Sequence, residues 1–530
     1  MALRILSETC CKTTELSASV CIVGAGFAGL VAATRLARDK KRHIVVLESG
    51  LCKLEPSVSA LNEIDNPCDN YQGALKGRYR GLGGTSLLWS GKLLPLSARD
   101  TQPRPELGVE GWPFDIAELE QYRQESEELM GVDSKPYDGR IAEQLDPKGL
   151  LPRNDVDFCL RWPKRPTVKN HNLAYVLRKE IQNLENVEIW LGATVSNFCF
   201  DSASGKVRGI TAVDHTGKTL TVKASEYLLA AGTLESTRLL LLADRQSNNS
   251  ISRHCDALGR YFNDHLGLHV AVVRPRNQTL TNQALSDRYT FGAARHLHFE
   301  LRPEVQMAHG IASAYFDTAA ELPESSALNK TKQVMQGLKR GKPAFRYLDL
   351  NDIVKDSPSL FWTAQWKSVR KQKYWPSNAY LPIEIRVEQL PLWKNRICLS
   401  RQPDALGVPK LQLDWHKTDA EEKAFRTMVR KLDRYWKDHL SGVCELDWIS
   451  EVLGPESRMV DSAIDLAHPA GSTRMGTNPR DSVVDPRLRV HRIPNLSVAS
   501  ASVFPSSGSA NPTLTIMHLA MRAADTLAKA

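Results

Sequence analysis

A chain of 530 residues with 42% hydrophobic and 24% charged residues has the composition of a globular protein, which excludes a disordered or fibrous architecture. Its length predicts about two to four domain-sized units, enough to enclose a large ligand. The 69 Lys and Arg residues exceed the 60 Asp and Glu residues by a small and dispersed margin, so nucleic acid is not expected as a partner.

The ten cysteines include no CxxC pair and no Cys/His cluster with zinc spacing, so reduced thiols and no metal site are expected. Residues 1–14 hold neither a long apolar run nor a small-residue cleavage pattern. No charge-free run of about 20 apolar residues occurs anywhere, which argues against a transmembrane segment. A cytoplasmic, reducing location is therefore the expectation.

In chain order, the first strong pattern is a βαβ unit. An apolar run at 20–23 predicts a strand, a glycine-rich turn follows at 24–29, and apolar residues at helical spacing come next. A second strand is expected at 44–47, and Glu48 ends it.

The turn has the spacing Gly24-x-Gly26-x-x-Gly29, in which each glycine has a mechanical role. The first allows the tight turn, the second lets a pyrophosphate approach the backbone, and the third lets the helix pack on the strand. Free amides at the helix start face the phosphates. Glu48, at about the expected 20-residue separation, can accept hydrogen bonds from both hydroxyls of an adenosine ribose and disfavours a 2′-phosphate. The unit predicts a dinucleotide site that does not take NADP, without separating FAD from NAD.

A second glycine-rich loop lies at 79–86, with Trp89 and Gly91 close behind it. Glycines let such a loop lie against a flat ring or a phosphate, because side chains would hold the backbone away. A surface turn explains this loop equally well when it is considered alone.

Two more strands complete the expected parallel sheet. One is predicted at 227–231 and is followed by a helix at 235–243. The other is predicted at 496–499, and after a loop a helix at 512–527 ends the chain. The middle of the chain has mixed periodicities and is where a substrate domain would vary. Within it, the basic aromatic segment 362–375 suits nucleic acid, anionic lipid or an acidic partner, although a solvated helix or lid with packed aromatics is favoured, because charge alone is weak support.

Together with the C-terminal block, these segments resemble the glucose-methanol-choline (GMC) oxidoreductases, flavoproteins that oxidise alcohols. The matching blocks stand at both ends of the chain in the family's order, while the middle matches loosely. Besides the two glycine loops and Glu48, the resemblance rests on Ala230-Ala231-Gly232 and on the closing run from His468-Pro469-Ala470-Gly471 to Asn511-Pro512-Thr513.

In this family the C-terminal block supplies an active-site pair, a histidine followed by histidine or asparagine. Carried over by motif, the pair is His468 and Asn511. The asparagine version resembles the cholesterol oxidase and pyranose oxidase branches, and the loop 83–89 with the tract 404–407 resembles the sugar-oxidising relatives. Some pyranose oxidases attach FAD through a histidine just before the tryptophan of this loop. Leu88 stands at that position here, so noncovalent FAD is expected.

The residue types suit alcohol oxidation, which removes a proton from oxygen and a hydride from carbon, the hydride passing to flavin N5. His468 is expected to be the base, since the pKa of histidine, about 6.5, lies near working pH. Asn511 is expected to orient the substrate oxygen through its amide. The other histidines His265, His491 and His518 are expected to be structural.

Asn511 followed by Pro512 also predicts a helix start, with Asn511 as the N-cap. Amides near Thr513 and Leu514 would then stabilise the negative charge that a flavin gains on reduction.

The expected fold is α/β, with a Rossmann-like FAD-binding domain, a parallel sheet containing the βαβ unit, interleaved with a second α+β substrate domain built on an antiparallel sheet. The FAD-binding domain is expected at 15–110, 175–268 and 460–530, and the substrate-binding domain with connecting segments at 111–174 and 269–459. The residues expected to bind FAD are Gly24, Gly26, Phe27, Ala28, Gly29, Glu48, Gly83, Gly84, Thr85, Ser86, Val195, Ala231, Gly232, Ala501, Asn511, Pro512 and Thr513.

The expected activity is FAD-dependent oxidation of the CH–OH group of a small alcohol, such as a sugar, glycoside or similar polyol, to a carbonyl. Dioxygen, a quinone or a carrier protein would reoxidise the flavin. One alternative is a non-sugar alcohol, namely a sterol, an aromatic alcohol or a natural-product intermediate, and another is a flavin electron-transfer protein without alcohol chemistry. Flavin monooxygenases and disulfide reductases begin with a similar turn, but the redox CxxC and second nucleotide motif of a reductase are absent.

Overall fold

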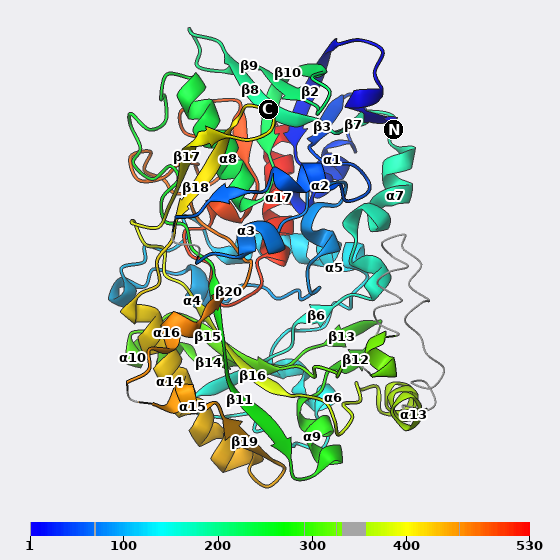
Figure 1. Ribbon diagram of the computed structural model, residues 1–530, viewed down its shortest axis with the longest axis vertical. Helices are drawn as coiled ribbons and strands as arrows, with labels where there is room; N and C mark the ends of the chain where they lie inside the picture. The colour runs from blue at the N-terminus through cyan, green and yellow to red at the C-terminus, as the bar shows by residue number, and fades with distance from the viewer. Residues whose placement is uncertain are drawn as a thin grey trace.

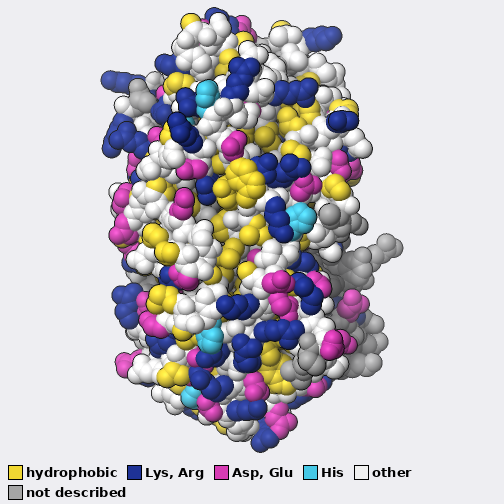
Figure 2. All heavy atoms as spheres, turned by 90° about the vertical axis from the view of Figure 1, so that its left-hand side faces the viewer, with side chains coloured by type: hydrophobic (Ala, Val, Ile, Leu, Met, Phe, Trp, Pro, Cys, Tyr) yellow, Lys and Arg dark blue, Asp and Glu magenta, His cyan; other side chains and the backbone are white. Residues whose placement is uncertain are grey.

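The computed structural model describes residues 2–67, 70–290, 292–324, 326–330, 357–454 and 456–529. Two sheets lie one above the other along the long axis of the molecule, the first in the upper half of Figure 1 and the second in the lower half. Each has its own hydrophobic core. Figure 2 shows basic and acidic side chains interspersed over one face, so that face carries no large field of a single sign.

The first sheet has the strand order β1-β7-β3-β2-β10-β9-β8, with β21 beside β10. The pairs formed by β1, β7, β3, β2, β10 and β21 are parallel, and β9 and β8 are added antiparallel. The strands are β1 (Ala2–Ile5), β2 (Thr13–Val23), β3 (Ile44–Glu48), β7 (Val187–Leu191), β8 (Thr194–Phe200), β9 (Val207–Val213), β10 (Thr219–Leu229) and β21 (Leu496–Val498).

The central strands of this sheet are apolar because both faces are covered. All five residues of β3 are buried, whereas β2 alternates between exposed and partly buried residues before its last four residues become fully buried. This half-exposed beginning explains why β2 starts at Thr13 and not at the expected residue 20. On one side α1 (Phe27–Leu36) contacts α17 (Thr513–Ala528), and their buried faces are rich in alanine, which lets the two helices approach closely.

The second sheet is antiparallel, with the order β19-β11-β16-β15-β14-β5 and β20 beside β11. The amphipathic helix α14 (Asp419–Tyr435) packs on it and begins at a capping box formed by Thr418 and Glu421. The strands are β5 (Phe158–Arg161), β11 (His265–Pro275), β14 (His298–Leu301), β15 (Ala314–Thr318), β16 (Pro382–Glu388), β19 (Cys444–Trp448) and β20 (Ile464–Asp465).

Two three-stranded sheets and further helices complete the fold. The small sheets contain β12 (Arg288–Thr290), β13 (Ala293–Arg295) and β6 (Lys164–Arg165), and β17 (Arg396–Pro403), β18 (Pro409–Asp414) and β4 (Ile64–Asp65). The other helices are α2 (Pro56–Ala60), α3 (Gly73–Lys76), α4 (Ala98–Thr101), α5 (Arg123–Met130), α6 (Ala142–Leu145), α7 (Leu173–Asn183), α8 (Thr233–Gln246), α9 (Gln278–Leu285), α10 (Pro303–His309), α13 (Ser357–Gln365), α15 (Ser450–Leu453) and α16 (Met459–Ser462).

The expected fold class is confirmed: a mainly parallel sheet with a βαβ unit is interleaved with an antiparallel one. Strands of the first sheet come from residues 2–48, 187–229 and 496–498, and those of the second from 158–161, 265–318, 382–388 and 444–465. The boundaries expected for the two domains stay a prediction. Strand β1, which the sequence pattern does not predict, pairs with β7 at the edge of the first sheet.

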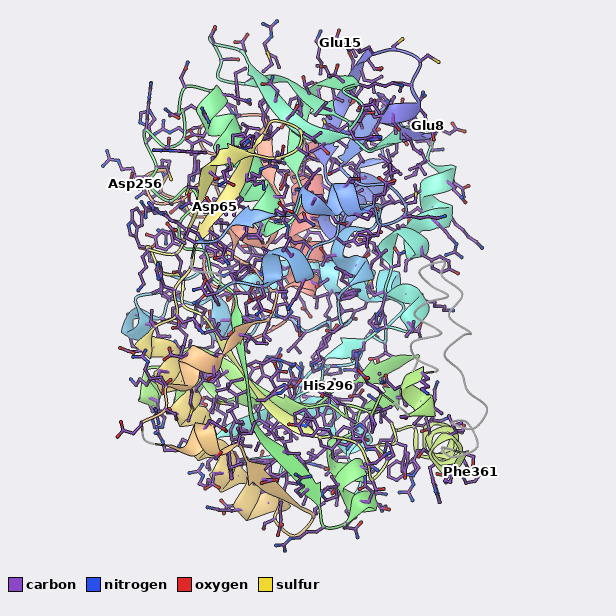
Figure 3. All side chains as sticks on the ribbon, viewed as in Figure 1. Glu8, Glu15, Asp65, Asp256, His296 and Phe361 are labelled. Carbon is purple, nitrogen blue, oxygen red and sulfur yellow. The ribbon has the colours of Figure 1, made fainter. Side chains whose placement is uncertain are left out.

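The basic aromatic segment forms α13 and a turn of π-helix, η8 (Trp366–Arg370). Trp366 and Trp375 are buried, while Trp362 and Phe361 are exposed on the outside of the molecule, where Figure 3 labels Phe361. This is the expected helix with some packed aromatics. In the described part of the chain, no helix is long and apolar enough to cross a membrane.

Candidate active site

A cavity of about 430 Å³ lies between the carboxyl ends of β2, β3 and β10 and the beginning of α17. It extends from Glu48, at the end of β3, to the side chains of His468 and Asn511. Of the residues predicted to form the site, those that line the cavity are Gly24, Gly26, Phe27, Ala28, Glu48, Gly84, Thr85, Val195, Ala231, Gly232, His468, Ala501, Asn511, Pro512 and Thr513.

The first glycine turn is fixed by close backbone packing. Gly24 has a φ of +103°, and a Cβ there would lie 2.6 Å from the carbonyl oxygen of Ala230. A Cβ on Gly29 would lie 1.8 Å from the carbonyl oxygen of Gly24, so helix α1 can rest on the turn only because residue 29 has no side chain. Gly26 is different, since the atom nearest to a Cβ added there would be the Cα of Gly84, at 3.8 Å. The middle glycine leaves room for a ligand against the backbone.

The second glycine loop docks on the first. Gly83 donates its N–H to the carbonyl of Ala25 at 2.9 Å, and a Cβ on Gly84 would lie 2.8 Å from the Cα of Gly26. The Ser86 hydroxyl donates to the Gly83 carbonyl at 2.6 Å and accepts from the Leu173 N–H at 3.0 Å. Gly29, Gly83 and Ser86 therefore do not line the cavity, and they shape it from behind.

Glu48 is buried at the nucleotide end of the cavity. Its Oε2 accepts from the Ala25 N–H at 2.8 Å, and its Oε1 accepts from the Gly50 N–H at 3.0 Å. Burial raises the pKa of this carboxyl, and the two amides act in the opposite direction. Each oxygen retains a second lone pair, so the carboxylate fits a ribose diol.

An ion network that sequence reasoning missed stands beside Glu48. The Arg80 guanidinium donates to Glu235 at 2.7 Å and to Asn62 at 2.8 Å, and Arg238 donates to Glu235 at 2.9 Å. Burial raises the pKa of Glu235, but the three guanidinium groups of Arg80, Arg238 and Arg78 outweigh it and lower that pKa to about 2. Arg80 stands in the glycine-rich loop and Glu235 opens α8, so their proximity follows only from the fold.

His468 and Asn511 meet at the other end of the cavity. The Asn511 Nδ2 lies 3.1 Å from the His468 Nε2, and the Asn511 Oδ1 has no hydrogen-bond partner among the described residues. The expected N-cap role of Asn511 is wrong, because Pro512 is the capping residue of α17 and no side chain caps that helix. The Asn511 amide faces the histidine instead, so it is available to a molecule in the cavity.

His265, the first residue of β11, contacts the pair, although it was expected to be structural. Its Nδ1 lies 3.0 Å from the Nδ1 of His468. When the His468 Nε2 accepts from Asn511, the single ring proton is on its Nδ1, which then donates to His265. This contact directs the Nε2 lone pair of His468 toward the cavity.

Asp264 holds the two histidine backbones in place. Its Oδ1 accepts from the N–H groups of His265 at 2.7 Å and His468 at 2.8 Å, and its Oδ2 accepts from the Tyr71 hydroxyl at 2.7 Å. Burial, with a smaller effect of Asp465, raises the pKa of Asp264 to about 8. The three donors oppose this rise, and they hold the carboxyl against the backbone of both histidines.

The imidazole of His468 is held in its neutral form. Burial lowers its pKa well below the usual 6.5, and His265, Arg386 and Lys92 lower it further. A neutral imidazole accepts a proton through its Nε2 lone pair once that lone pair is no longer bonded to the Asn511 amide.

Lys92 also lines the cavity and connects it to the antiparallel sheet. Its Nζ donates to Asp317 at 2.6 Å and lies 3.4 Å from the Nε2 of His298, and Arg386 donates to the same Asp317 oxygen at 2.6 Å. His296, labelled in Figure 3, lies 2.6 Å from Asp287 and 2.8 Å from Asp317 through its two nitrogens. Asp317 and the two histidines are spaced as metal ligands. The Asp317 oxygen between the two histidines already accepts hydrogen bonds from the Lys92 and Arg386 cations.

Two family models match the chain. The FAD binding domain matches residues 19–271, and the GMC oxidoreductase C-terminal domain matches residues 391–520. The second match includes both His468 and Asn511.

Several curated proteins are similar over much of the chain. The 6'''-hydroxyparomomycin C oxidase of Streptomyces lividus is 24% identical, over 96% of this chain and 91% of its own length. The 2-methyl-1,2-propanediol dehydrogenase of Mycolicibacterium austroafricanum is 23% identical, over 84% of this chain and 80% of its own. The fructose dehydrogenase large subunit of Gluconobacter japonicus is 24% identical over 74% of this chain, and the match spans 61% of that subunit's length.

Solved structures share the fold. A formate oxidase of Aspergillus oryzae RIB40 covers 97% of this chain and 98% of its own, with a TM-score of 0.59 and 17% identity. The pyridoxine 4-oxidase from Mesorbium loti covers 96% and 98%, with a TM-score of 0.59 and 18% identity. With an FAD-binding first half and a GMC C-terminal domain on this fold, the chain belongs to the GMC family of FAD-dependent oxidoreductases, enzymes that act on CH–OH groups.

Proposed function

We propose that this enzyme oxidises a CH–OH group of a small polyhydroxylated alcohol, a sugar, glycoside or similar polyol, to a carbonyl. His468 is the base, and Asn511 orients the substrate oxygen. One observation carries the proposal: the His468 Nε2 and the Asn511 Nδ2 lie 3.1 Å apart in the same cavity that begins at the glycine turn and Glu48.

The cavity residues fit FAD. Gly26 leaves open space at the start of α1, Glu48 presents carboxylate lone pairs, and Gly232 has no neighbour within 4 Å of where a Cβ would stand. Leu88 lines the cavity where a histidine would be needed for covalent attachment through this loop, so FAD is held noncovalently there. When bound, FAD supplies the acceptor for the hydride that leaves the carbinol carbon.

The side chains divide the remaining work. The His468 Nε2 accepts the hydroxyl proton. The His468 Nδ1–H remains hydrogen-bonded to the His265 Nδ1, and this bond fixes the orientation of the ring. The Asn511 Nδ2 donates to the substrate oxygen and holds the carbinol in one orientation. Burial, together with His265, Arg386 and Lys92, keeps His468 unprotonated before the reaction. The Lys92 cation, which lines the cavity, stabilises the negative charge that develops on the substrate oxygen as its proton leaves.

The activities named for similar proteins support a hydroxylated substrate. Besides the three above, they include a C-glycoside 3-oxidase of Arthrobacter globiformis, 30% identical over 24% of this chain. The diol dehydrogenase among them supports the second candidate, a non-sugar alcohol. Both oxidases and dehydrogenases occur in this group, so dioxygen, a quinone and a carrier protein all stand as acceptors to be tested.

The decisive experiment is anaerobic mixing of the purified yellow protein with a panel of sugars, glycosides, diols, sterols and aromatic alcohols. Loss of the flavin absorbance identifies the substrate class, and addition of air or a quinone then identifies the acceptor. Bleaching by sugars or glycosides is the expected result. Bleaching only by sterols or aromatic alcohols would reject the sugar assignment, and bleaching by none of the panel would reject alcohol oxidation.

A further inference from the structure

The charges around the two ends of the cavity differ. Among the described residues that line it, the only carboxylates are Glu48 and Glu235. Glu48 is bonded to the glycine turn, and Glu235 is paired with Arg80 and Arg238. In the described structure no carboxylate lines the end that holds His468 and Asn511, so a substrate there meets no fixed negative charge.

Lys92 is a cation that lines the cavity and acts on His468, and it is held in place by the antiparallel sheet. Its side chain is buried, and two of its donors are directed to Asp317 in β15 and to His298 in β14. An ammonium has three N–H donors, and the described residues provide no partner for the third. Because Lys92 also lines the cavity, that third donor is available to a substrate.

The ammonium is charged under ordinary conditions. Burial lowers its pKa to about 8, against the opposing effect of Asp317, so it stays protonated below that pH. Burial also disfavours the ionised form of Asp317, but Arg386 and Lys92 hold its pKa well below the usual value, so the anchoring carboxylate stays ionised too. Arg386 bonds to the same Asp317 oxygen and is also paired with Glu384, so the charges of this group balance, and Lys92 is its member that lines the cavity.

His468 experiences the resulting field. Besides burial, three neighbouring groups disfavour a positive charge on its ring, namely His265, Arg386 and Lys92. Asp264 bonds to the backbone N–H of His468, not to its ring, and does not line the cavity. An ammonium group bound beside the reacting carbon would meet the Lys92 ammonium, and none of the described residues lining this end of the cavity offers it a carboxylate.

We propose that Lys92 is a substrate-recognition residue that binds an acceptor oxygen, a carboxylate or a hydroxyl group, next to the reacting carbinol. The enzyme then selects sugar acids and neutral polyols and rejects amino alcohols and amino sugars at that position. This inference rests on the proposed function, because it uses the same cavity.

Three matched ligands test it: gluconate, sorbitol and glucamine share one polyol chain and differ only in a terminal carboxylate, hydroxymethyl or aminomethyl group. Their dissociation constants are measured anaerobically at pH 7 from the perturbation of the flavin absorbance. Where a ligand also bleaches the flavin, the fast binding phase in stopped flow gives the constant before reduction. Binding is thereby separated from turnover, so the inference can fail while alcohol oxidation stands, and the reverse.

In the wild type we expect gluconate to bind most tightly and glucamine most weakly, with about tenfold between them, the scale of one charge contact at a partly desolvated site. Lys92→Met should bring the three constants within about twofold of one another, and Lys92→Arg should keep the wild-type order. Lys223→Met is the control, because it removes one exposed lysine paired with Glu15 on the outside of the first sheet. Its ratios should equal those of the wild type.

Three results would overturn the inference. The first is glucamine binding as tightly as gluconate to the wild type, and the second is no measurable binding of any of the three at hundreds of millimolar. The third is an unchanged ratio in Lys92→Met protein that retains its yellow FAD and its melting temperature. If Lys92→Met does not fold, the wild-type order and its retention in Lys92→Arg decide the question.

Discussion

The nucleotide end of the cavity is formed mainly by backbone, whereas the substrate end is formed by side chains from four distant segments. Gly24, Gly26 and the amides around Glu48 come from one continuous βαβ unit. The side chains of the substrate end come from loops and one strand: Lys92, His265, His468 and Asn511. The first and last of them are 419 positions apart in the sequence. Local sequence therefore specifies the first end, and only the packing of the second sheet against the first specifies the other.

The difference predicts how each end fails. A substitution at the nucleotide end should damage folding or FAD retention, because its groups are packed backbone. A substitution at the substrate end should leave the yellow protein intact and change the reaction, because its side chains face the cavity.

The largest expected effect is on the reaction. His468→Ala should retain FAD, while the rate of flavin reduction by substrate falls about 10² to 10⁴-fold, since the positioned base is lost. Stopped-flow spectroscopy under anaerobic conditions measures it. His491→Ala is the matched control, because His491 bonds to Ser482 and does not line the cavity. Reduction of His468→Ala at the wild-type rate would remove the assignment of the base.

At the opposite end, Gly24→Ala should destabilise the fold by about 2–4 kcal/mol and abolish FAD retention, because its Cβ would lie 2.6 Å from the Ala230 carbonyl oxygen. Gly149→Ala is the control: that glycine also has a positive φ, +62°, but no atom within 4 Å of the added carbon. It should cost only the backbone strain, about 1 kcal/mol. Thermal unfolding and the flavin absorbance after dialysis measure both. Equal losses in the two variants would show that the turn is not tightly packed.

A smaller effect is expected where one side chain positions another. His265→Phe removes the acceptor of the His468 Nδ1–H and should lower kcat about tenfold, the scale of one lost hydrogen bond, with KM little changed. His265→Asn keeps an acceptor and should recover most of the rate.

The pH profile separates this role from a purely structural one. In the wild type, the pKa of His468 lies well below 6.5, so the reduction rate should begin to fall only at a pH below that value. Removing His265 removes one group that lowers the His468 pKa, while Arg386, Lys92 and burial remain, so the fall should begin at a higher pH. An unchanged pH profile together with a lowered melting temperature would make His265 a packing residue only.

The last prediction concerns the pH dependence of stability. Burial raises the pKa of Asp264 in the folded state to about 8, from the usual aspartate value of 3.8, so between these values the folded state binds more protons than the unfolded state. Stability should therefore fall as pH rises through this window, by a few kcal/mol at most. Asp264→Asn mimics the protonated form and should flatten the decline. Melting temperatures of both proteins from pH 4 to 9 test this, and parallel curves would contradict it.

The sequence by itself determined the βαβ unit, the interleaved α/β class, the dinucleotide turn with Glu48, and His468 and Asn511 as candidates, because each depends on short-range spacing or on a motif. The GMC resemblance read from those blocks is confirmed by the family matches. Strand and helix positions were predicted to within a few residues for β3, α17 and β21, whose buried runs are clear.

Only the tertiary structure decided which of these residues face the cavity. Gly29, Gly83 and Ser86 lie behind it, since the two glycine loops pack on each other, and Asn511 bonds to His468 across 43 positions instead of capping α17. His265 and Lys92 carry no local signal, because their roles arise from contacts across 203 and 225 positions. Side-chain chemistry at the substrate end depends on two sheets meeting, and no short segment contains both.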